Sequence, residues 1–241
     1  MTDAGRTRWG VRAAAIYGAA HAAEYRVHDD KVRTERTVTA LRGWLGAICE
    51  GYSHPIDVLE LGCGTGRYFH TLSNVRRLVG IDVSQPMLEH ARTPSGDVVV
   101  LPEQITLIED DFLQHEFGAG EFDFVYSIGV LAEQTPFDRA LAARVHRWLR
   151  PGGRFAFSAV SLRSWSLRPT WKRRAAQWMV DAGIAPAPVR RTLRRRLLDG
   201  GLYADEPYLH DVLTEVGLRV ESMEPFDSDA HRHFWTVAVR P

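Results

Sequence analysis

A short apolar run leads directly into three alternating glycines, in the sequence Val58-Leu59-Glu60-Leu61-Gly62-Cys63-Gly64-Thr65-Gly66. Glycine tolerates a positive φ and lets a ligand approach the main chain closely. A helix that follows such a loop offers free N–H groups and the positive end of its dipole. The pattern therefore indicates either a site for a nucleotide-like ligand or a purely structural turn.

The neighbouring residues narrow the kind of ligand. The nicotinamide fingerprint requires Gly-x-Gly-x-x-Gly, and here its third glycine falls on Arg67; the Gly-Lys-Ser/Thr of a Walker loop is absent. Asp82 ends the next apolar run, where a carboxylate can accept hydrogen bonds from both ribose hydroxyls. Asp82 could instead cap the following helix, but Ser84 already suits that role.

Between Val58 and Ser158 the chain resembles the class I S-adenosylmethionine-dependent methyltransferases of the small-molecule type. The resemblance rests on residues 58–66, 80–84, 109–112, 122–127 and 149–155, which follow one another in the order usual for this family. It implies that Glu60 stands at the family's acidic position, that Asp111 faces the adenine amino group, and that the main chain of Phe112 faces the ring. The residues that it assigns to the cofactor are Tyr17, Tyr25, Glu60, Gly62, Cys63, Gly64, Gly66, Asp82, Val83, Met87, Asp111, Phe112 and Ser127.

In such a reaction the sulfonium activates the methyl group, so the protein must align a nucleophile, which can be worth ~7–11 kcal/mol, and remove any proton that it carries. Glu133 is the first candidate base, because the resemblance places the loop after the fourth strand near the methyl group. Its alternative role is to cap the helix near Asp138. His28, in the N-terminal helices, and His233, next to His231 in the last hairpin, are further candidates, with packed or solvated positions as the alternative for each.

The order of elements predicts an α/β fold: a Rossmann-like, seven-stranded, mostly parallel sheet with helices on both faces. An N-terminal lid of two helices is expected within residues 1–51, and the cofactor-binding core over 52–160. A helical insertion over the active site is expected at 161–203, followed by the rest of the core with an antiparallel hairpin at 204–241. The expected strands are 56–61, 78–83, 105–108, 122–127, 154–160, 218–224 and 234–240, and the helices of the core are 67–73, 86–92, 138–149 and 206–216.

The expected insertion is rich in tryptophan and arginine. Three interpretations of its arginines stay open: phosphate contacts to RNA, a pocket for an acidic small molecule, or a solvated helix whose arginine stems cover tryptophan rings. The residues concerned are Trp165, Trp171, Trp178, Tyr203, Arg190, Arg191, Arg194, Arg195 and Arg196.

Composition bears on the partners. The 241 residues include 30 basic and 30 acidic side chains, whereas RNA-binding proteins are usually basic. We therefore expect a small-molecule substrate rather than nucleic acid or a membrane; a homodimer stays open. The two cysteines, Cys49 and Cys63, are expected to be reduced, as in a cytoplasmic protein. The scattered histidines predict no metal site.

The sequence thus predicts S-adenosylmethionine-dependent methyl transfer to an O or N atom of a small, partly hydrophobic metabolite, with bacterial secondary metabolism as the expected setting. The first alternative is a protein of the same fold that binds S-adenosylmethionine but catalyses another reaction, such as a cyclisation. An RNA methyltransferase, a non-catalytic binding module and a nicotinamide dehydrogenase are the others.

Overall fold

The computed structural model describes residues 5–32, 34–93, 100–162, 164, 202–228 and 231–241. The arginines at 190–196 and the tryptophans at 165, 171 and 178 lie outside these residues, so the helical insertion stays a prediction. Among the described helices, none is both long and apolar enough to cross a bilayer.

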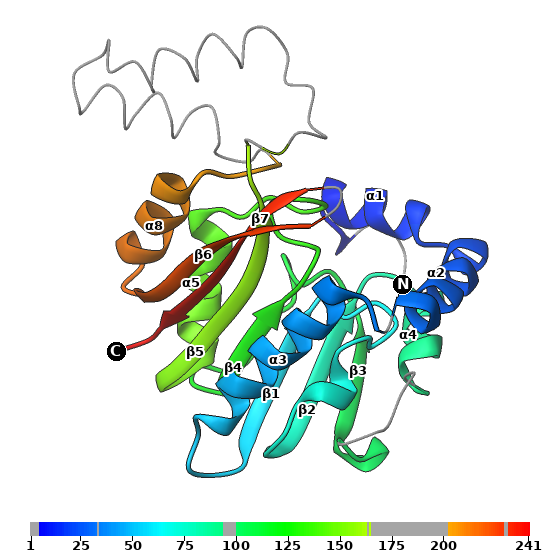
Figure 1. Cartoon of the computed structure of the whole chain (residues 1–241), viewed down its shortest axis with the longest axis horizontal. Helices are drawn as coiled ribbons and strands as arrows, with labels where there is room; N and C mark the ends of the chain where they lie inside the picture. Colours follow the sequence, from blue (N-terminus) through cyan, green and yellow to red (C-terminus); the bar gives the residue numbers. More distant parts are fainter. Residues whose placement is uncertain (1–4, 33, 94–99, 163, 165–201, 229–230) are drawn as a thin grey trace, which may run out of the picture.

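The described strands form one seven-stranded sheet in the order β3-β2-β1-β4-β5-β7-β6. The first five strands in this order are parallel to one another, whereas β7 runs antiparallel to both β5 and β6. This confirms the expected sheet and its closing hairpin (Figure 1). The strands are β1 Ile56–Leu61, β2 Val75–Asp82, β3 Ile105–Glu109, β4 Phe122–Ser127, β5 Leu149–Val160, β6 Arg219–Asp227 and β7 Arg232–Val239.

Helices cover both faces of the sheet, and the helices α1 (Arg8–Ile16) and α2 (Ala19–Val32) lie beyond the ends of its strands (Figure 1). The hydrophobic contacts place α3 and α4 on one face and α5 and α8 on the other. The α-helices are α1 Arg8–Ile16, α2 Ala19–Val32, α3 Arg36–Glu50, α4 Gln85–Ala91, α5 Arg139–Trp148 and α8 Glu206–Glu215, with short 3₁₀ turns η2 Phe69–Thr71 and η3 Pro102–Gln104.

Three expectations about the elements were wrong. The N-terminal region holds three helices instead of two, because the chain leaves helical geometry at Tyr17. Residues 67–73 form only the turn η2, between Gly66 and Asn74, which both have positive φ and so leave helical geometry. Strand β5 begins at Leu149 instead of residue 154, so it also includes Pro151, Gly152 and Gly153.

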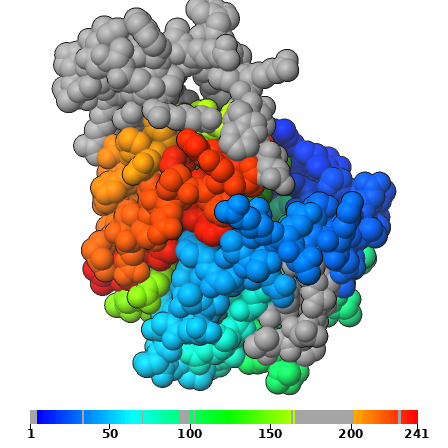
Figure 2. Space-filling view, viewed as in Figure 1, coloured from blue at the N-terminus to red at the C-terminus, as the bar shows by residue number. Residues whose placement is uncertain are grey.

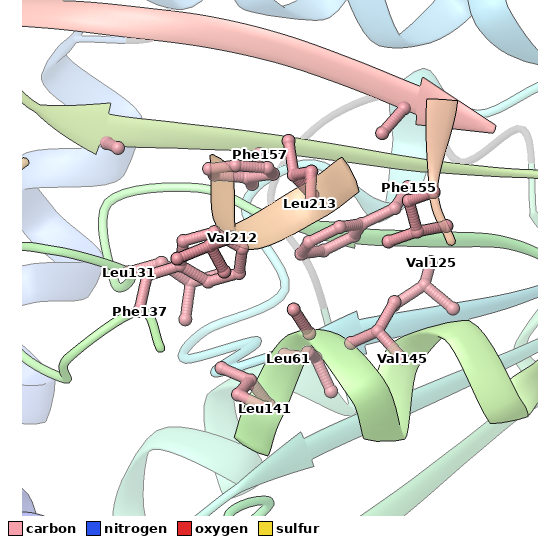
Figure 3. Packing of buried hydrophobic residues seen from close by; sticks show 14 of the residues in the cluster. Leu61, Val125, Leu131, Phe137, Leu141, Val145, Phe155, Phe157, Val212 and Leu213 are labelled. Carbon is pink, nitrogen blue, oxygen red and sulfur yellow. The ribbon is translucent and has the colours of Figure 1, made fainter. Parts of the chain in front are cut away.

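Strand β1 shows how the two faces are built. All six of its residues are buried. Leu59 and Leu61 pack toward α5 and α8, whereas Ile56 and Val58 pack toward α3, as the two-residue period of a strand requires. Figure 3 shows the hydrophobic cluster on the face covered by α5 and α8, in which Leu61 lies among side chains of α5, β5 and α8. A strand buried on both faces is held firmly, and so is the glycine loop that follows it.

Candidate active site

The glycine loop lies at the carboxyl end of β1. Gly62 and Gly64 have φ values of +72° and +53°, a region that side chains disfavour. A Cβ on Gly62 would lie 2.7 Å from Cγ2 of Val130, so glycine is also required by space. The main-chain N–H groups of Gly62 and Cys63 donate to Ile81 O at 2.8 and 3.2 Å, which ties the loop to β2.

Asp82, at the end of β2, is held by main-chain donors. Its Oδ2 accepts from Gly64 N and its Oδ1 from Ser84 N, both at 2.9 Å. Burial raises the pKa of Asp82, and these hydrogen bonds oppose that rise. The Ser84 hydroxyl accepts from Met87 N at 3.3 Å and so caps α4, as expected. Each carboxylate oxygen of Asp82 keeps a second acceptor position for a ligand.

Asp111, which follows β3, accepts hydrogen bonds from Thr7 at the start of α1. Its Oδ2 accepts from Thr7 N at 2.8 Å and Thr7 Oγ1 at 2.6 Å, and its Oδ1 accepts from Leu113 N at 3.0 Å. A carboxylate has about four acceptor positions, so these contacts leave one. Thr7 also caps α1 by accepting from Gly10 N at 3.1 Å. A Cβ on Gly10 would clash with the Asp111 carboxylate, so α1 docks closely.

Glu60 is a buried acid beside the loop, only 2% exposed. The Tyr126 hydroxyl donates to its Oε2 at 2.7 Å. Burial raises the pKa of Glu60 well above its ordinary value. Because no described residue forms an ion pair with it, the Glu60 carboxyl is suited to a positively charged ligand group.

A single cavity of about 470 Å³ runs from the glycine loop in both directions. Its lining residues extend from Asp111, which follows β3, to His233 and Trp235 of β7, and these two strands lie on opposite sides of β1 in the sheet. The expected cofactor residues that line it are Tyr17, Tyr25, Glu60, Gly62, Cys63, Gly64, Asp82, Val83, Met87, Asp111 and Phe112.

Two of the expected cofactor residues, Gly66 and Ser127, are not among the lining residues. A Cβ on Gly66 would lie 2.7 Å from the ring of Phe69, so this glycine permits close packing of η2. The Ser127 hydroxyl donates to Leu61 O at 2.8 Å and is fully buried. Gly66 therefore supports the glycine loop through its packing against Phe69, and Ser127 supports it through its hydrogen bond to Leu61.

Tyr17 and Tyr25 bring the N-terminal helices to the cavity. Their rings meet edge to face, with centroids 6.3 Å apart. Burial raises the pKa of Tyr17 to about 12, so its hydroxyl stays protonated. The main-chain oxygen of Tyr17 accepts from the Ser84 hydroxyl at 2.5 Å, which fixes the end of α1 above α4.

Glu133 lies on the cavity wall, in the tight loop after β4. Burial raises the pKa of Glu133 to about 7. The alternative role as a helix cap belongs to another residue, because Asp138 accepts from Leu141 N at 3.0 Å and caps α5. Ala132, next to Glu133, has a φ of +57°, and its oxygen accepts from Tyr203 N at 2.7 Å. The loop is therefore fixed, and it presents a carboxyl group poised to exchange a proton near neutral pH.

The candidate histidines His28 and His233 line the same cavity. Burial, together with the nearby His231, lowers the pKa of His233 to about 4. His233 is therefore neutral at pH 7, and its Nε2 lies 3.3 Å from Ser228 Oγ. A neutral imidazole can accept or donate a hydrogen bond without bringing charge into the site.

Part of the wall comes from apolar residues of α3 and β7, which sequence reasoning did not assign to the site. Val38 and Leu41 of α3 line the cavity, as does Trp235. The Trp235 ring stacks on Phe226 at 4.1 Å and lies 5.4 Å from Trp44. Figure 2 shows the blue surface of the N-terminal helices meeting the orange and red surface of the closing strands. The apolar spacing in α3 indicated a helix but not what that helix would face.

The fold and this site fit an S-adenosylmethionine-binding protein of class I. The φ-positive loop, the ribose-type carboxylate of Asp82 and the unpaired acid Glu60 fit a cofactor that combines a nucleoside with a positively charged sulfonium and ammonium. Residues 58–153 match the family model described as a methyltransferase domain. These residues are thus a methyltransferase domain, and the fold is the one seen in S-adenosylmethionine-dependent methyltransferases of class I.

Among curated proteins, the chain is 35% identical over 101 residues to a methyltransferase of Synechocystis sp. named as uncharacterised, a match that covers 41% of this chain and 44% of that one. The chain spans less than half the length of the curated relatives it matches first.

Solved structures show the same fold. Magnesium protoporphyrin IX methyltransferase from Synechocystis, crystallised with S-adenosylmethionine, aligns over 100% of both chains with a TM-score of 0.65 and 16% identity. The [4+2]-cyclase SpnF aligns over 85% of this chain and 82% of its own, with a TM-score of 0.58 and 15% identity. At such identities the likeness concerns the fold alone.

Proposed function

We propose that this protein transfers the methyl group of S-adenosylmethionine to an O or N atom of a small, partly hydrophobic metabolite. The observation that carries the proposal is the continuity of the cavity. The glycine loop, Asp82 and Asp111 line one part of it, and Glu133, His233 and Trp235 line another. A cofactor and an acceptor can therefore meet in one cavity.

The residues divide the work by position. Asp82 would accept hydrogen bonds from the ribose hydroxyls, and Asp111 would use its remaining acceptor position for the adenine amino group. Glu60 would complement positive charge beside the loop. When bound, the cofactor supplies an electrophilic methyl group that needs no activation by the protein. The chain's contribution is alignment of the acceptor and exclusion of water.

Glu133 is the proposed general base. A group with a pKa near the working pH combines a useful ionised fraction with sufficient basicity. The Glu133 carboxylate would take up the proton that the acceptor oxygen or nitrogen loses on methylation. His28 and neutral His233 are proposed to hold the acceptor through hydrogen bonds.

The wall of the acceptor end supports a partly hydrophobic substrate. Val32, Val38, Leu41 and Trp235 supply apolar surface there, while a few polar groups lie among them. We also propose a cytoplasmic setting, in keeping with free Cys49 and Cys63. Bacterial secondary metabolism stays our proposed context.

The first test is calorimetric titration with S-adenosylmethionine and with S-adenosylhomocysteine, followed by a screen of metabolites for release of S-adenosylhomocysteine. Micromolar binding of both ligands and turnover with a small metabolite would support the proposal. A folded protein that binds neither would overturn it. If only RNA were methylated, methyl transfer from S-adenosylmethionine would stand, but the proposed small-molecule substrate would be wrong.

A non-methylating reaction is the second candidate, because the [4+2]-cyclase SpnF shares this fold. The two candidates differ in what happens to the cofactor. A cyclase-like protein would change its substrate while S-adenosylmethionine stays intact, which mass spectrometry of both molecules would detect.

A further inference from the structure

Glu133 is an acid of the cavity wall that has no counter-charge in the described part of the chain. It lies in the tight loop after β4, and no described residue forms a hydrogen bond or an ion pair with its side chain. Taking a carboxylate out of water without a partner costs free energy. A positively charged group on a ligand would recover part of that cost.

Two tyrosines from the N-terminal helices lie within electrostatic reach of Glu133. Burial is the main cause of the raised pKa of Tyr17 and of Tyr25, and the negative charge of Glu133 adds to it in both. A tyrosine hydroxyl with a raised pKa stays protonated and uncharged near neutral pH. These neighbours therefore supply no positive charge to Glu133.

The basic residues of the cavity wall do not neutralise Glu133 either. Arg67 is the only lysine or arginine among the described lining residues, and its Nε donates to Asp29 Oδ1 at 2.5 Å. His233 is neutral, since burial lowers its pKa to about 4. His28 and His231 also line the cavity but form no hydrogen bond or ion pair with Glu133 in the described structure.

The two kinds of acceptor atom differ in how burial affects the loss of their proton. An ammonium group that gives its proton to a carboxylate leaves two neutral groups, and burial favours neutral forms. A hydroxyl group that does the same leaves one negative charge, as before the transfer. The environment that raises the pKa of Glu133 to about 7 therefore assists deprotonation of an amine and gives no such help to a hydroxyl.

We propose that the methyl acceptor is the nitrogen of a small amine with an apolar body, bound as an ammonium ion by the Glu133 carboxylate. This inference rests on the methyl transfer proposed above and names its acceptor atom. Val38, Leu41 and Trp235 supply apolar contacts for the body of the amine.

The transfer step balances in atoms and charge. The ammonium gives one proton to Glu133, and the freed lone pair on nitrogen forms the bond to the methyl carbon. The bond between this carbon and sulfur breaks, and its electron pair stays on sulfur. The products are a methylated ammonium ion, S-adenosylhomocysteine and a protonated Glu133, which then releases its proton to solvent.

The test compares probes of similar size that differ in one polar group. They are 2-phenylethylamine, 2-phenylethanol and 4-ethylphenol. We would measure their dissociation constants by calorimetry on the protein saturated with S-adenosylhomocysteine, at about pH 8, where the Glu133 carboxyl is ionised and the amine is protonated. The same titrations would be made on Glu133→Gln and on the matched control Glu35→Gln. Glu35 lines the same cavity but is exposed, so solvent screens its charge.

We expect the wild-type protein to prefer the amine over both hydroxyl compounds by about 10- to 100-fold, the effect of one charged hydrogen bond. Glu133→Gln should reduce this preference to less than about twofold, whereas Glu35→Gln should keep it. In the wild-type protein the affinity for the amine should fall by about tenfold per pH unit below about pH 7, as Glu133 takes up a proton. The affinity for the alcohol should not change over that range.

Three results would overturn the inference. They are an amine that binds no more tightly than the alcohol, a preference that survives in Glu133→Gln, and a metabolite screen in which only hydroxyl compounds are methylated. Each of them leaves methyl transfer itself standing, whereas a folded protein that does not bind S-adenosylhomocysteine would overturn the proposed function as well. Circular dichroism would verify folding, and the pH series on the wild-type protein needs no variant.

Discussion

The cofactor end and the acceptor end of the cavity are built in different ways. At the cofactor end, Asp82 accepts two main-chain N–H groups, and Asp111 accepts from Thr7 and Leu113. At the acceptor end, burial alone raises the pKa of Glu133 to about 7. The first end is held by the main chain at strand ends, and the second depends on how side chains from distant segments are buried.

This difference separates binding from reactivity. Hydrogen bonds from the main chain oppose the rise in the pKa of Asp82 that burial causes and hold its carboxyl group in one orientation, which suits recognition of an unvarying cofactor. A carboxyl group whose pKa is set by burial can take up and release a proton near neutral pH, which suits catalysis. The two ends should therefore respond differently to substitution.

The substitution Glu133→Gln should produce the largest effect. It keeps the shape of the side chain but removes the base, so kcat should fall by about 10²- to 10⁴-fold. Affinity for S-adenosylmethionine should stay within about twofold of wild type, because the cofactor end is untouched. Steady-state kinetics and calorimetry would measure the two quantities. Glu35→Gln, at another acid of the cavity wall, is the matched control and should retain activity.

Asp82→Ala tests the opposite end. Loss of the hydrogen bonds between its carboxylate and the ribose should weaken S-adenosylmethionine binding by roughly 10- to 100-fold in calorimetry. With the cofactor saturating, kcat should fall much less than in Glu133→Gln. A change in affinity of less than about twofold would show that Asp82 does not bind the ribose, and it would contradict the proposed difference between the two ends of the cavity.

The pH dependence sharpens the comparison. The base form of Glu133 is the carboxylate, so with a pKa of about 7 the value of kcat/KM should rise with pH and level off above about 7. Below that midpoint it should fall by about tenfold per pH unit. Cofactor affinity should not follow this curve. A profile of kcat/KM that keeps the same midpoint in Glu133→Gln would assign the titration to another group.

The smallest effect is expected at the helix cap. Thr7→Ala removes the hydroxyl that accepts from Gly10 N and donates to Asp111, so the free energy of unfolding should fall by ~1 kcal/mol. For a chain of this size the melting temperature should drop by about 2–4 °C. Thr7→Ser keeps the hydroxyl and should melt like wild type. An equal loss in both variants would point to the methyl group instead.

The cofactor end could largely be predicted from the sequence because its parts are local. Gly62 and Gly64 lie in the loop just after β1, and Asp82 is the last residue of β2. Ser84 caps α4, the helix that comes next. Strands of a parallel sheet bring their carboxyl ends to one edge, so position in the sequence is enough to place these residues.

The other contacts could not be predicted, because they join residues far apart in the chain. Arg67 meets Asp29 across 38 positions, and Asp111 meets Thr7 across 104. Helical spacing in α3 predicted a helix, while its orientation over the cavity depends on packing against β7. The pKa of Glu133 is likewise a property of burial in the folded chain.

The docking of α1 on Asp111 has a thermodynamic consequence. Thr7 and, as proposed, the adenine amino group share one carboxylate, so the folding of the first helix and the occupancy of the site are linked equilibria. If the ligand favours the docked helix by some factor, the docked helix must favour the ligand by the same factor. The first turn of the chain's first helix is in that sense an allosteric partner of the cofactor.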